Sequence, residues 1–276
     1  MSFLVSPVKT STQDKLRQLQ QLFKELKSCI IAYSGGLDST FLVKIANDVL
    51  GKNALAVTVT SSTYPKRELK DAKQFARMIG IPHVVIQSEE LDIKRFSENP
   101  PNRCYYCKKS LFRKIIQIAK NHSFDVVCDG SNADDTADYR PGEKAKRELG
   151  IRSPLLEVGL TKREIREISK SMGLKSCDKP AFACLASRFP YGMKITKKKL
   201  GQVESAEDFL FSLGIRQCRV RYHEYIARIE VIEVDLPVVL RNAERIIKRF
   251  KKLGFMYITL DLQGYRTGSL NEVLVK

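Results

Sequence analysis

The sequence predicts an α/β fold with a parallel sheet, followed by a smaller α+β domain. Three observations support this prediction. Short apolar runs alternate with segments of helical periodicity through the first half of the chain, polar or glycine-rich turns follow several of these runs, and the pattern changes near residue 190. A chain of 276 residues is long enough for two domains, which we place at residues 1–190 and 191–276.

The first predicted elements form a βαβ unit. Apolar residues recur at helical spacing over 16–26, and 29–33 is a short apolar run that ends at two glycines. Helical periodicity returns over 38–50, and 54–60 is typical of a buried strand. Because a helix connects two apolar strands, the strands are expected to be parallel.

The alternation continues with a helix over 66–78, a strand over 83–86, a helix after Cys107 and a strand over 124–128. Ligands of parallel sheets lie beyond the carboxyl ends of the strands. We therefore expect the turns at 34–36, 60–61 and 129–131 to meet in one crevice.

The second domain is predicted from a different order of elements. A helix to residue 213 precedes two strands, and a second helix and a last strand complete the chain. The predicted strands are 217–222, 227–231 and 256–261, and the second helix ends at 253.

Composition indicates a globular protein with an anionic partner. Lys and Arg outnumber Asp and Glu by 48 to 31, a net charge of +17 that attracts phosphorylated ligands or RNA, although solvated basic helices would give the same value. No segment approaches the roughly 18 uninterrupted apolar residues that a membrane span requires. We therefore expect a cytoplasmic protein without a membrane partner.

The seven cysteines are odd in number and irregularly spaced, which favours thiol chemistry or metal binding over a disulfide framework. Cys29, Cys128 and Cys218 fall in apolar strand patterns and are expected in the core. Cys177 has no predicted role.

Residues 34–40, SGGLDST, directly follow an apolar strand and begin a helix. The glycines let the backbone approach a ligand that the helix N–H groups would face, which suits a phosphate chain. The lysine of the general P-loop pattern is absent. Asp38 instead offers a carboxylate to Mg²⁺.

This string resembles the pyrophosphate loop of the PP-loop ATP pyrophosphatases, an adenine nucleotide alpha hydrolase-like fold whose members adenylate a substrate and release pyrophosphate. The resemblance implies ATP and Mg²⁺ as cofactors, with Asp38 as a catalytic magnesium ligand. The ATP-binding residues that it implies are Ser34, Gly35, Gly36, Asp38, Ser39, Thr40, Thr58 and Gly130.

An acidic segment follows the strand predicted at 124–128. Asp129, Asp134 and Asp135 could complete a magnesium site. Alternatively, the segment is a capped acidic loop, because Asp, Asn and Ser also favour turns.

Cys104 and Cys107 form a CxxC motif, and Cys184 lies far along the chain. Three thiolates can hold three irons of a [4Fe-4S] cluster and leave the fourth iron open to sulfur or substrate. Zinc fits less well, because no second CxxC or paired histidines supply a fourth ligand. Redox-active or buried thiols remain alternatives.

Further strings resemble the LarE family, ATP-dependent sulfur transferases of nickel-pincer nucleotide biosynthesis, over nearly the whole chain. They are DYRPG at 138–142, SRFPYG at 187–192, RVRYH at 219–223, ARIE at 227–230 and TLDL at 259–262.

The resemblance implies that the chain adenylates the carboxylates of pyridinium-3,5-biscarboxylic acid mononucleotide and inserts sulfur, for the cofactor of lactate racemase. AMP is a better leaving group than hydroxide, so a weak sulfur nucleophile can displace it. In one branch of the family three cysteines, here Cys104, Cys107 and Cys184, hold the cluster, whereas another branch sacrifices one cysteine close to the Cys184 position. We expect the cluster branch, with Cys184 catalytic, an unidentified sulfur donor and a homo-oligomer.

Arg219 and Arg221 lie two residues apart on a predicted strand and so face the same side. Taken alone, such arginines are more typical of a solvated face. The resemblance implies instead that they hold a substrate phosphate, with Arg188, Arg228 and Glu230 as weaker candidates for the same pocket.

The main alternative is a tRNA thiolation enzyme, which the positive charge and the cysteines would suit. No appended RNA-binding module is recognisable, so a nucleic-acid partner is disfavoured. An amidotransferase-like synthetase would leave the cysteines unexplained.

Overall fold

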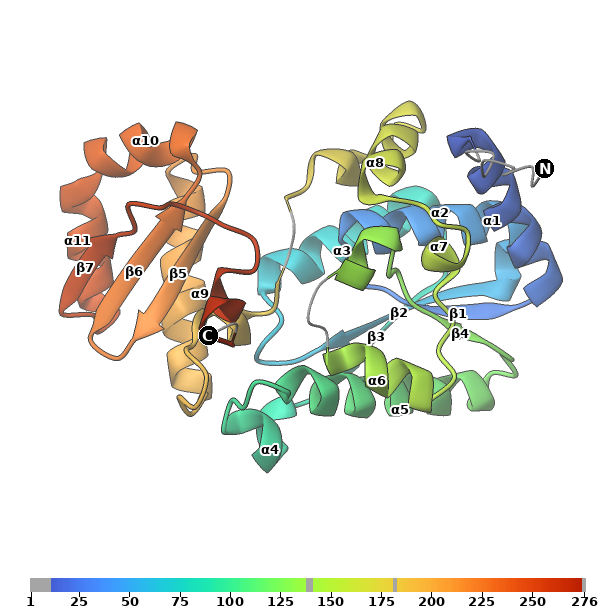
Figure 1. The fold of residues 1–276 in the computed structure, drawn as a ribbon, viewed down its shortest axis with the longest axis horizontal. Coiled ribbons are helices and arrows are strands. Elements are labelled where there is room, and N and C mark those ends of the chain that lie inside the picture. Colours follow the sequence, from blue (N-terminus) through green and yellow to red (C-terminus); the bar gives the residue numbers. More distant parts are fainter. Residues whose placement is uncertain (1–10, 138–140, 181–182, 275–276) are drawn as a thin grey trace, which may run out of the picture.

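The computed structural model describes residues 11–137, 141–180 and 183–274 and contains two sheets with separate sets of helices (Figure 1). Residues 138–140 of the DYRPG string, and Ala181 and Phe182, lie outside the described residues. Within the described ranges, no helix is long and apolar enough to cross a membrane.

The N-terminal sheet has the strand order β3-β2-β1-β4, and every neighbouring pair is parallel, which confirms the predicted α/β architecture. Its central strands are apolar because both faces are covered by helices. The strands are β1 (Cys29–Ala32), β2 (Ala54–Thr60), β3 (His83–Gln87) and β4 (Val127–Cys128).

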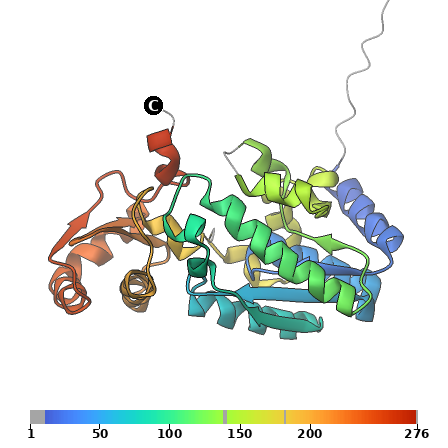
Figure 2. The ribbon, with the colours of Figure 1, turned by 90° about the horizontal axis from the view of Figure 1, so that it is seen from below.

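Helices cover both faces of this sheet (Figures 1 and 2). One face packs against buried side chains of α1, α2, α3 and α8, and the other packs against α5. The short α4 and α6 flank α5, and α7 lies near α1. The helices are α1 (Thr12–Leu26), α2 (Leu37–Leu50), α3 (Lys66–Ile79), α4 (Lys94–Ser97), α5 (Arg103–Asn121), α6 (Pro141–Glu148), α7 (Pro154–Glu157) and α8 (Lys162–Ser171).

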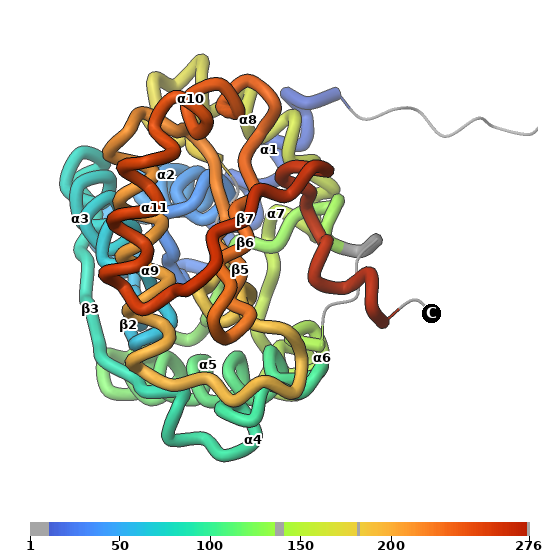
Figure 3. Tube along the Cα trace, turned by 90° about the vertical axis from the view of Figure 1, so that its left-hand side faces the viewer, coloured from blue at the N-terminus to red at the C-terminus, as the bar shows by residue number. Residues whose placement is uncertain are grey.

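The C-terminal sheet has the order β5-β6-β7, with β5 antiparallel and β7 parallel to β6. Figure 3 shows α9 and α11 along one side of its strands. The elements are α9 (Lys197–Ser212), β5 (Cys218–His223), β6 (Ile226–Val231), α10 (Leu236–Arg241), α11 (Ala243–Lys252) and β7 (Tyr257–Leu260).

Three predicted boundaries are wrong. The helix expected after Cys107 begins at Arg103, because Pro100 and Pro101 end the preceding segment and the CxxC motif itself forms the first turn. The strand expected over 124–128 pairs only at 127–128. The helix expected to end at 253 is divided into α10 and α11.

The core of the C-terminal sheet extends back into the first half of the chain. Phe96 of α4, Leu185 and Phe189 are buried in the same apolar cluster as the inner face of β5 and β6. This packing joins the segment around Cys184 to the C-terminal sheet. The domain boundary at residue 190 stays a prediction.

Candidate active site

The loop between β1 and α2 depends on two close approaches of the backbone. Gly35 has φ +67°, and a Cβ at this position would lie 2.7 Å from the Ala72 Cβ in α3. A Cβ at Gly130 would lie 3.0 Å from the backbone N of Ser39. Glycine at position 35 therefore lets the loop after β1 pack against α3, and glycine at position 130 lets the loop after β4 approach the start of α2.

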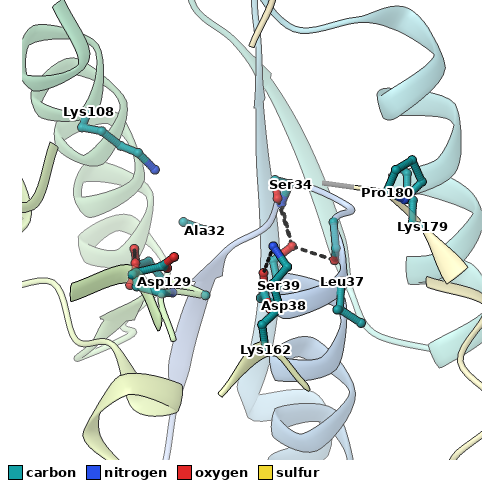
Figure 4. Close-up of a pocket in the computed structure, with 14 residues that line it drawn as sticks. Ala32, Ser34, Leu37, Asp38, Ser39, Lys108, Asp129, Lys162, Lys179 and Pro180 are labelled. Carbon is teal, nitrogen blue, oxygen red and sulfur yellow. Dashed lines mark hydrogen bonds and ion pairs between the residues drawn. The ribbon is translucent and has the colours of Figure 1, made fainter. Parts of the chain in front are cut away.

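These loops enclose a cavity of about 300 Å³ at the carboxyl ends of β1 and β4 (Figure 4). Ser34 and Ser39 hydroxyls lie 3.0 Å apart across the loop, and the N-terminus of α2 faces the cavity. The arrangement offers backbone N–H groups and hydroxyls to an anion. The predicted residues that line it are Ser34, Gly36, Asp38, Ser39 and Gly130.

Asp38 is the carboxylate of this cavity. Burial raises the pKa of Asp38 and the nearby charge of Asp135 adds to this, while Lys162, with Nζ 3.9 Å from Oδ2, opposes it. The Oδ1 atom is buried without a hydrogen-bond partner among the described residues. A divalent cation would satisfy this oxygen, so Asp38 fits the predicted Mg²⁺.

The acidic loop after β4 is less available for a metal. Asp129 accepts hydrogen bonds from Ser131 and Ser153 and pairs with the Lys146 ammonium at 3.0 Å. Asp134 accepts a hydrogen bond from the backbone of Lys162. Asp135 lines the cavity. Capping and ion pairing thus explain most of this segment.

Three lysines that the sequence did not single out also line the loop cavity: Lys108, Lys162 and Lys179. Lys179 donates to the Gly35 carbonyl and pairs with Glu68 at 2.7 Å. For two of them the signal in the sequence was position, since Lys108 directly follows the CxxC motif and Lys179 begins the segment that leads to Cys184. Lys162 had no such signal.

Three of the predicted nucleotide-binding residues do not line the cavity. The Thr58 hydroxyl is buried, donates to the Tyr33 carbonyl and lies 2.8 Å from the His83 ring. Thr40 is buried inside α2, and Gly35 contributes its carbonyl to Lys179. The Thr58 and Thr40 side chains both face the protein interior, and their assignment to ATP binding stays a prediction.

The three candidate cluster cysteines line a second cavity, of about 340 Å³. Cys104 and Cys107 lie on the first turn of α5, where a three-residue spacing places them on one face. Cys184 enters from the segment that packs against the C-terminal sheet. Ala32, Ser34 and Lys108 line this cavity and the loop cavity, so the two adjoin.

Burial raises the pKa of the Cys107 thiol well above its usual value, and the nearby Glu90 and Cys184 raise it further. Within the described ranges, no three His, Cys, Asp or Glu side chains form a group that could hold a metal ion. A cluster differs from a single ion in that each cysteine binds a separate iron. Three thiols that line one cavity could bind one iron each, so the choice between a cluster and another use of these thiols stays a prediction.

The other cysteines occupy structural positions. Cys29 in β1, Cys128 in β4 and Cys218 in β5 are buried, as predicted. Cys177 is also buried, and its carbonyl accepts a hydrogen bond from Arg166.

Arg188 is fully buried, and it lies in the wall of a further cavity that Arg221 and Arg228 also line. Its guanidinium forms two hydrogen bonds of 2.8 and 2.9 Å with Glu207, which is also fully buried. Its third nitrogen donates to the carbonyls of Ala183 and Cys184. Substrate binding by Arg188 stays a prediction. In this structure its donors hold Glu207 and the Cys184 segment.

Arg219 and Arg221 do face the same side of the C-terminal sheet, opposite α9. The Arg221 guanidinium forms a bidentate salt bridge with Glu230 and donates a further hydrogen bond to the Ser187 carbonyl. Arg219 stacks on the Tyr265 ring, 5.1 Å from its centroid.

Arg221 and the more exposed Arg228 line a third cavity, of about 460 Å³, together with Arg266 and His223. Burial lowers the pKa of His223, and the charges of Arg228 and Arg221 lower it further. The Arg266 Nη1 and His223 Nε2 atoms are buried without a hydrogen-bond partner within the described residues. This cavity would favour an anion.

Comparison with known proteins places these features in a family. The family model of NAD synthase matches residues 10–112. An uncharacterized protein of Synechocystis is 45% identical over 96% of this chain and 99% of its own length. A tRNA-specific 2-thiouridylase of Rickettsia rickettsii is 28% identical over 55% of this chain and 51% of its own length.

Pyridinium-3,5-bisthiocarboxylic acid mononucleotide synthase of Lactiplantibacillus plantarum is 38% identical over 95% of this chain and 95% of its own length. The match covers both sheets and the cysteine segment, not the nucleotide loop alone. The chain therefore belongs to the LarE family of PP-loop proteins.

Proposed function

We propose that this chain uses ATP to adenylate the carboxylates of pyridinium-3,5-biscarboxylic acid mononucleotide and replaces them with thiocarboxylates. The observation that carries the proposal is the contact between the loop cavity and the cysteine cavity, which share Ala32, Ser34 and Lys108. An activated carboxylate and a sulfur nucleophile must meet within bonding distance, and adjoining cavities allow this. The name of the Lactiplantibacillus relative supports the choice of substrate.

The loop cavity is suited to the first half of the reaction. The loop from Ser34 to Ser39 and the N-terminus of α2 would hold the pyrophosphate part of ATP. Asp38 would hold Mg²⁺, which compensates the charge that develops on the leaving pyrophosphate. Val57 and Val59 line the adjoining cavity and would offer an apolar surface to the adenine.

The cysteine cavity is suited to sulfur delivery. Cys104, Cys107 and Cys184 would hold a [4Fe-4S] cluster, whose remaining iron would bind the sulfide to be transferred. Arg188 fixes the backbone of Cys184 and so the direction from which this ligand enters. The sacrificial route, in which Cys184 itself gives up its sulfur, is the alternative that iron analysis decides.

The cavity of Arg221, Arg228, Arg266 and His223 would bind the phosphate of the pyridinium nucleotide. Its positive field and the unpartnered buried Arg266 Nη1 donor support this role. Glu230 in β6 would hold the Arg221 side chain in position at this cavity, and Arg219 lies opposite Glu230 on the paired strand β5.

A direct test mixes anaerobically purified protein with ATP, Mg²⁺, the biscarboxylic nucleotide and sulfide as the sulfur source. Pyrophosphate release and replacement of oxygen by sulfur in the nucleotide, measured by mass spectrometry, are the expected results. Cys184→Ala should keep pyrophosphate release and lose the sulfur product. Pyrophosphate release without a sulfur-containing nucleotide from the wild type would contradict the proposal.

Iron and acid-labile sulfide analysis tests the cluster separately. About four irons per chain in the wild type, lost in Cys184→Ala, are expected for a three-cysteine cluster. Absence of iron after anaerobic reconstitution, with loss of one sulfur from Cys184 during turnover, would establish the sacrificial route instead.

The similarity to a tRNA thiouridylase and the net charge of +17 favour tRNA as a second candidate substrate. The same assay with tRNA distinguishes the two, since thiolated nucleosides would then appear without pyridinium product.

A further inference from the structure

Lys108 is a positively charged residue of the site, and the family motifs give this lysine no role. It follows Cys107 in α5 and lines both the loop cavity and the cysteine cavity. Figure 4 shows its side chain reaching from α5 toward the cavity that Ser34 and Asp38 line from the other side. Lys108 is thus placed where the two halves of the reaction would meet.

The Lys108 side chain is held in position by its apolar part. A Cβ at Gly142 in α6 would lie only 3.0 Å from the Lys108 Cγ, so the glycine makes room for the methylene chain. The ammonium lies 5.2 Å from the centroid of the Phe112 ring, one turn along α5. This packing aims the ammonium at the cavity before any ligand binds.

Among the described residues, no ion pair neutralises the charge of Lys108. Within residues 11–137, 141–180 and 183–274, no carboxylate lies within salt-bridge distance of its ammonium, whereas the neighbouring Lys109 pairs with Glu148 at 2.7 Å. Burial would raise the pKa of Asp129, but the charges of Lys146 and Lys108 lower it. The positive field of Lys108 therefore acts on the loop cavity.

We propose that Lys108 is a catalytic residue that binds the α-phosphate of ATP and then the phosphate of the acyl-adenylate. The inference rests on the proposed function. If the pyrophosphate part occupies the Ser34–Ser39 loop, the α-phosphate lies toward the cysteine cavity, because the activated carbon must be reached by sulfur. Lys108 is a basic residue that lines both cavities and so faces this position.

The charge of Lys108 would assist both steps. In the first, a carboxylate oxygen of the substrate bonds to the α-phosphorus, the bond from this phosphorus to the bridging oxygen breaks, and pyrophosphate leaves with the electron pair. In the second, sulfide bonds to the acyl carbon and the carbon–oxygen bond to AMP breaks, so AMP leaves with the pair. A fixed cation at the phosphate stabilises the charge that each step develops there.

The test compares Lys108→Ala and Lys108→Arg with Lys109→Ala, a matched control one residue away on the same helix. We expect Lys108→Ala to lower kcat for pyrophosphate release roughly 100-fold with a smaller change in KM for ATP, since the contact strengthens in the transition state. Lys108→Arg should recover part of the rate because it keeps the charge. Lys109→Ala should stay within about twofold of the wild type, because its partners Glu148 and Tyr105 lie on the surface.

Iron content and thermal unfolding are measured on the same samples and should not change. Wild-type rates in Lys108→Ala, or loss of iron in parallel with activity, would overturn the inference. Failure of the wild type to release pyrophosphate would instead show that the proposed function is wrong, and the assignment of Lys108 would fall with it.

Discussion

Two groups of charged side chains, one at each sheet, are arranged in opposite ways. At the N-terminal sheet, Asp38 and Lys108 face a cavity, and the Lys162 ammonium is 3.9 Å from the Asp38 carboxylate. At the C-terminal sheet, the Arg188–Glu207 pair is fully buried and doubly hydrogen-bonded. Charges that neutralise each other internally have little left for a ligand, so the first arrangement indicates a binding site and the second a scaffold.

The largest effect is expected at Asp38. Asp38→Asn should reduce pyrophosphate release by at least roughly 100-fold, because the amide cannot replace the carboxylate as a Mg²⁺ ligand. Thermal unfolding should change little, since the buried Oδ1 has no hydrogen-bond partner to lose among the described residues. The matched control is Asp48→Asn on the same helix, whose carboxylate pairs only with Lys44 at the surface. Continued pyrophosphate release by Asp38→Asn would contradict its assignment.

The buried pair tests the scaffold side of the comparison. Arg188→Met should lower the free energy of unfolding by about 3–5 kcal/mol, because it leaves the Glu207 carboxylate buried without its partner. Urea denaturation measures this change. Arg152→Met breaks the exposed pair with Glu157 and should cost about 1 kcal/mol or less. Equal losses in the two variants would show that the Arg188 pair is not a scaffold.

Within the C-terminal sheet, Arg228 tests whether an exposed arginine beside a buried ion pair binds substrate. Its side chain is 41% exposed, and it lines the third cavity beside the buried Arg221–Glu230 pair. Arg228→Ala should raise KM for the pyridinium nucleotide roughly tenfold, as expected for loss of one charge-assisted hydrogen bond to phosphate, with little change in unfolding. An unchanged KM would indicate that the substrate phosphate binds elsewhere.

The smallest effect is expected at the Lys15–Glu164 pair, which joins α1 to α8. Burial would raise the pKa of Glu164, but hydrogen bonds from Lys15 and Thr161 lower it from 4.5 to about 2. The stability that Glu164 contributes is therefore present above pH 4.5 and is lost as pH falls toward 2. Glu164→Gln should be less stable than the wild type at pH 7, and urea titrations should show the difference shrinking below pH 4.5. A difference that does not depend on pH would contradict this origin.

Local patterns in the sequence were sufficient to predict the elements on either side of the nucleotide loop. The apolar run ending at Ser34, the glycines and the helical period after Asp38 predicted β1, the loop and α2 within one residue. The same holds for β2 and α3. The sequence was less informative at residues 103–107, where the helix begins one residue before the CxxC motif. The preceding prolines and the motif spacing do not show on which side of the helix start the cysteines lie.

The sequence by itself determined the chemistry available to this protein: a glycine loop with Asp38, three cysteines for one cavity, and arginines on one face of a strand. Only the tertiary structure decided which of these groups are free to act. Arg188 and Thr58 are engaged in the interior, whereas Lys108, which no motif marks, faces both cavities. The physical reason is that the availability of a polar group depends on its partners, which come from other parts of the chain. Strand pairing between β2 and β3 brings His83 to Thr58, and the packing of α9 brings Glu207 to Arg188.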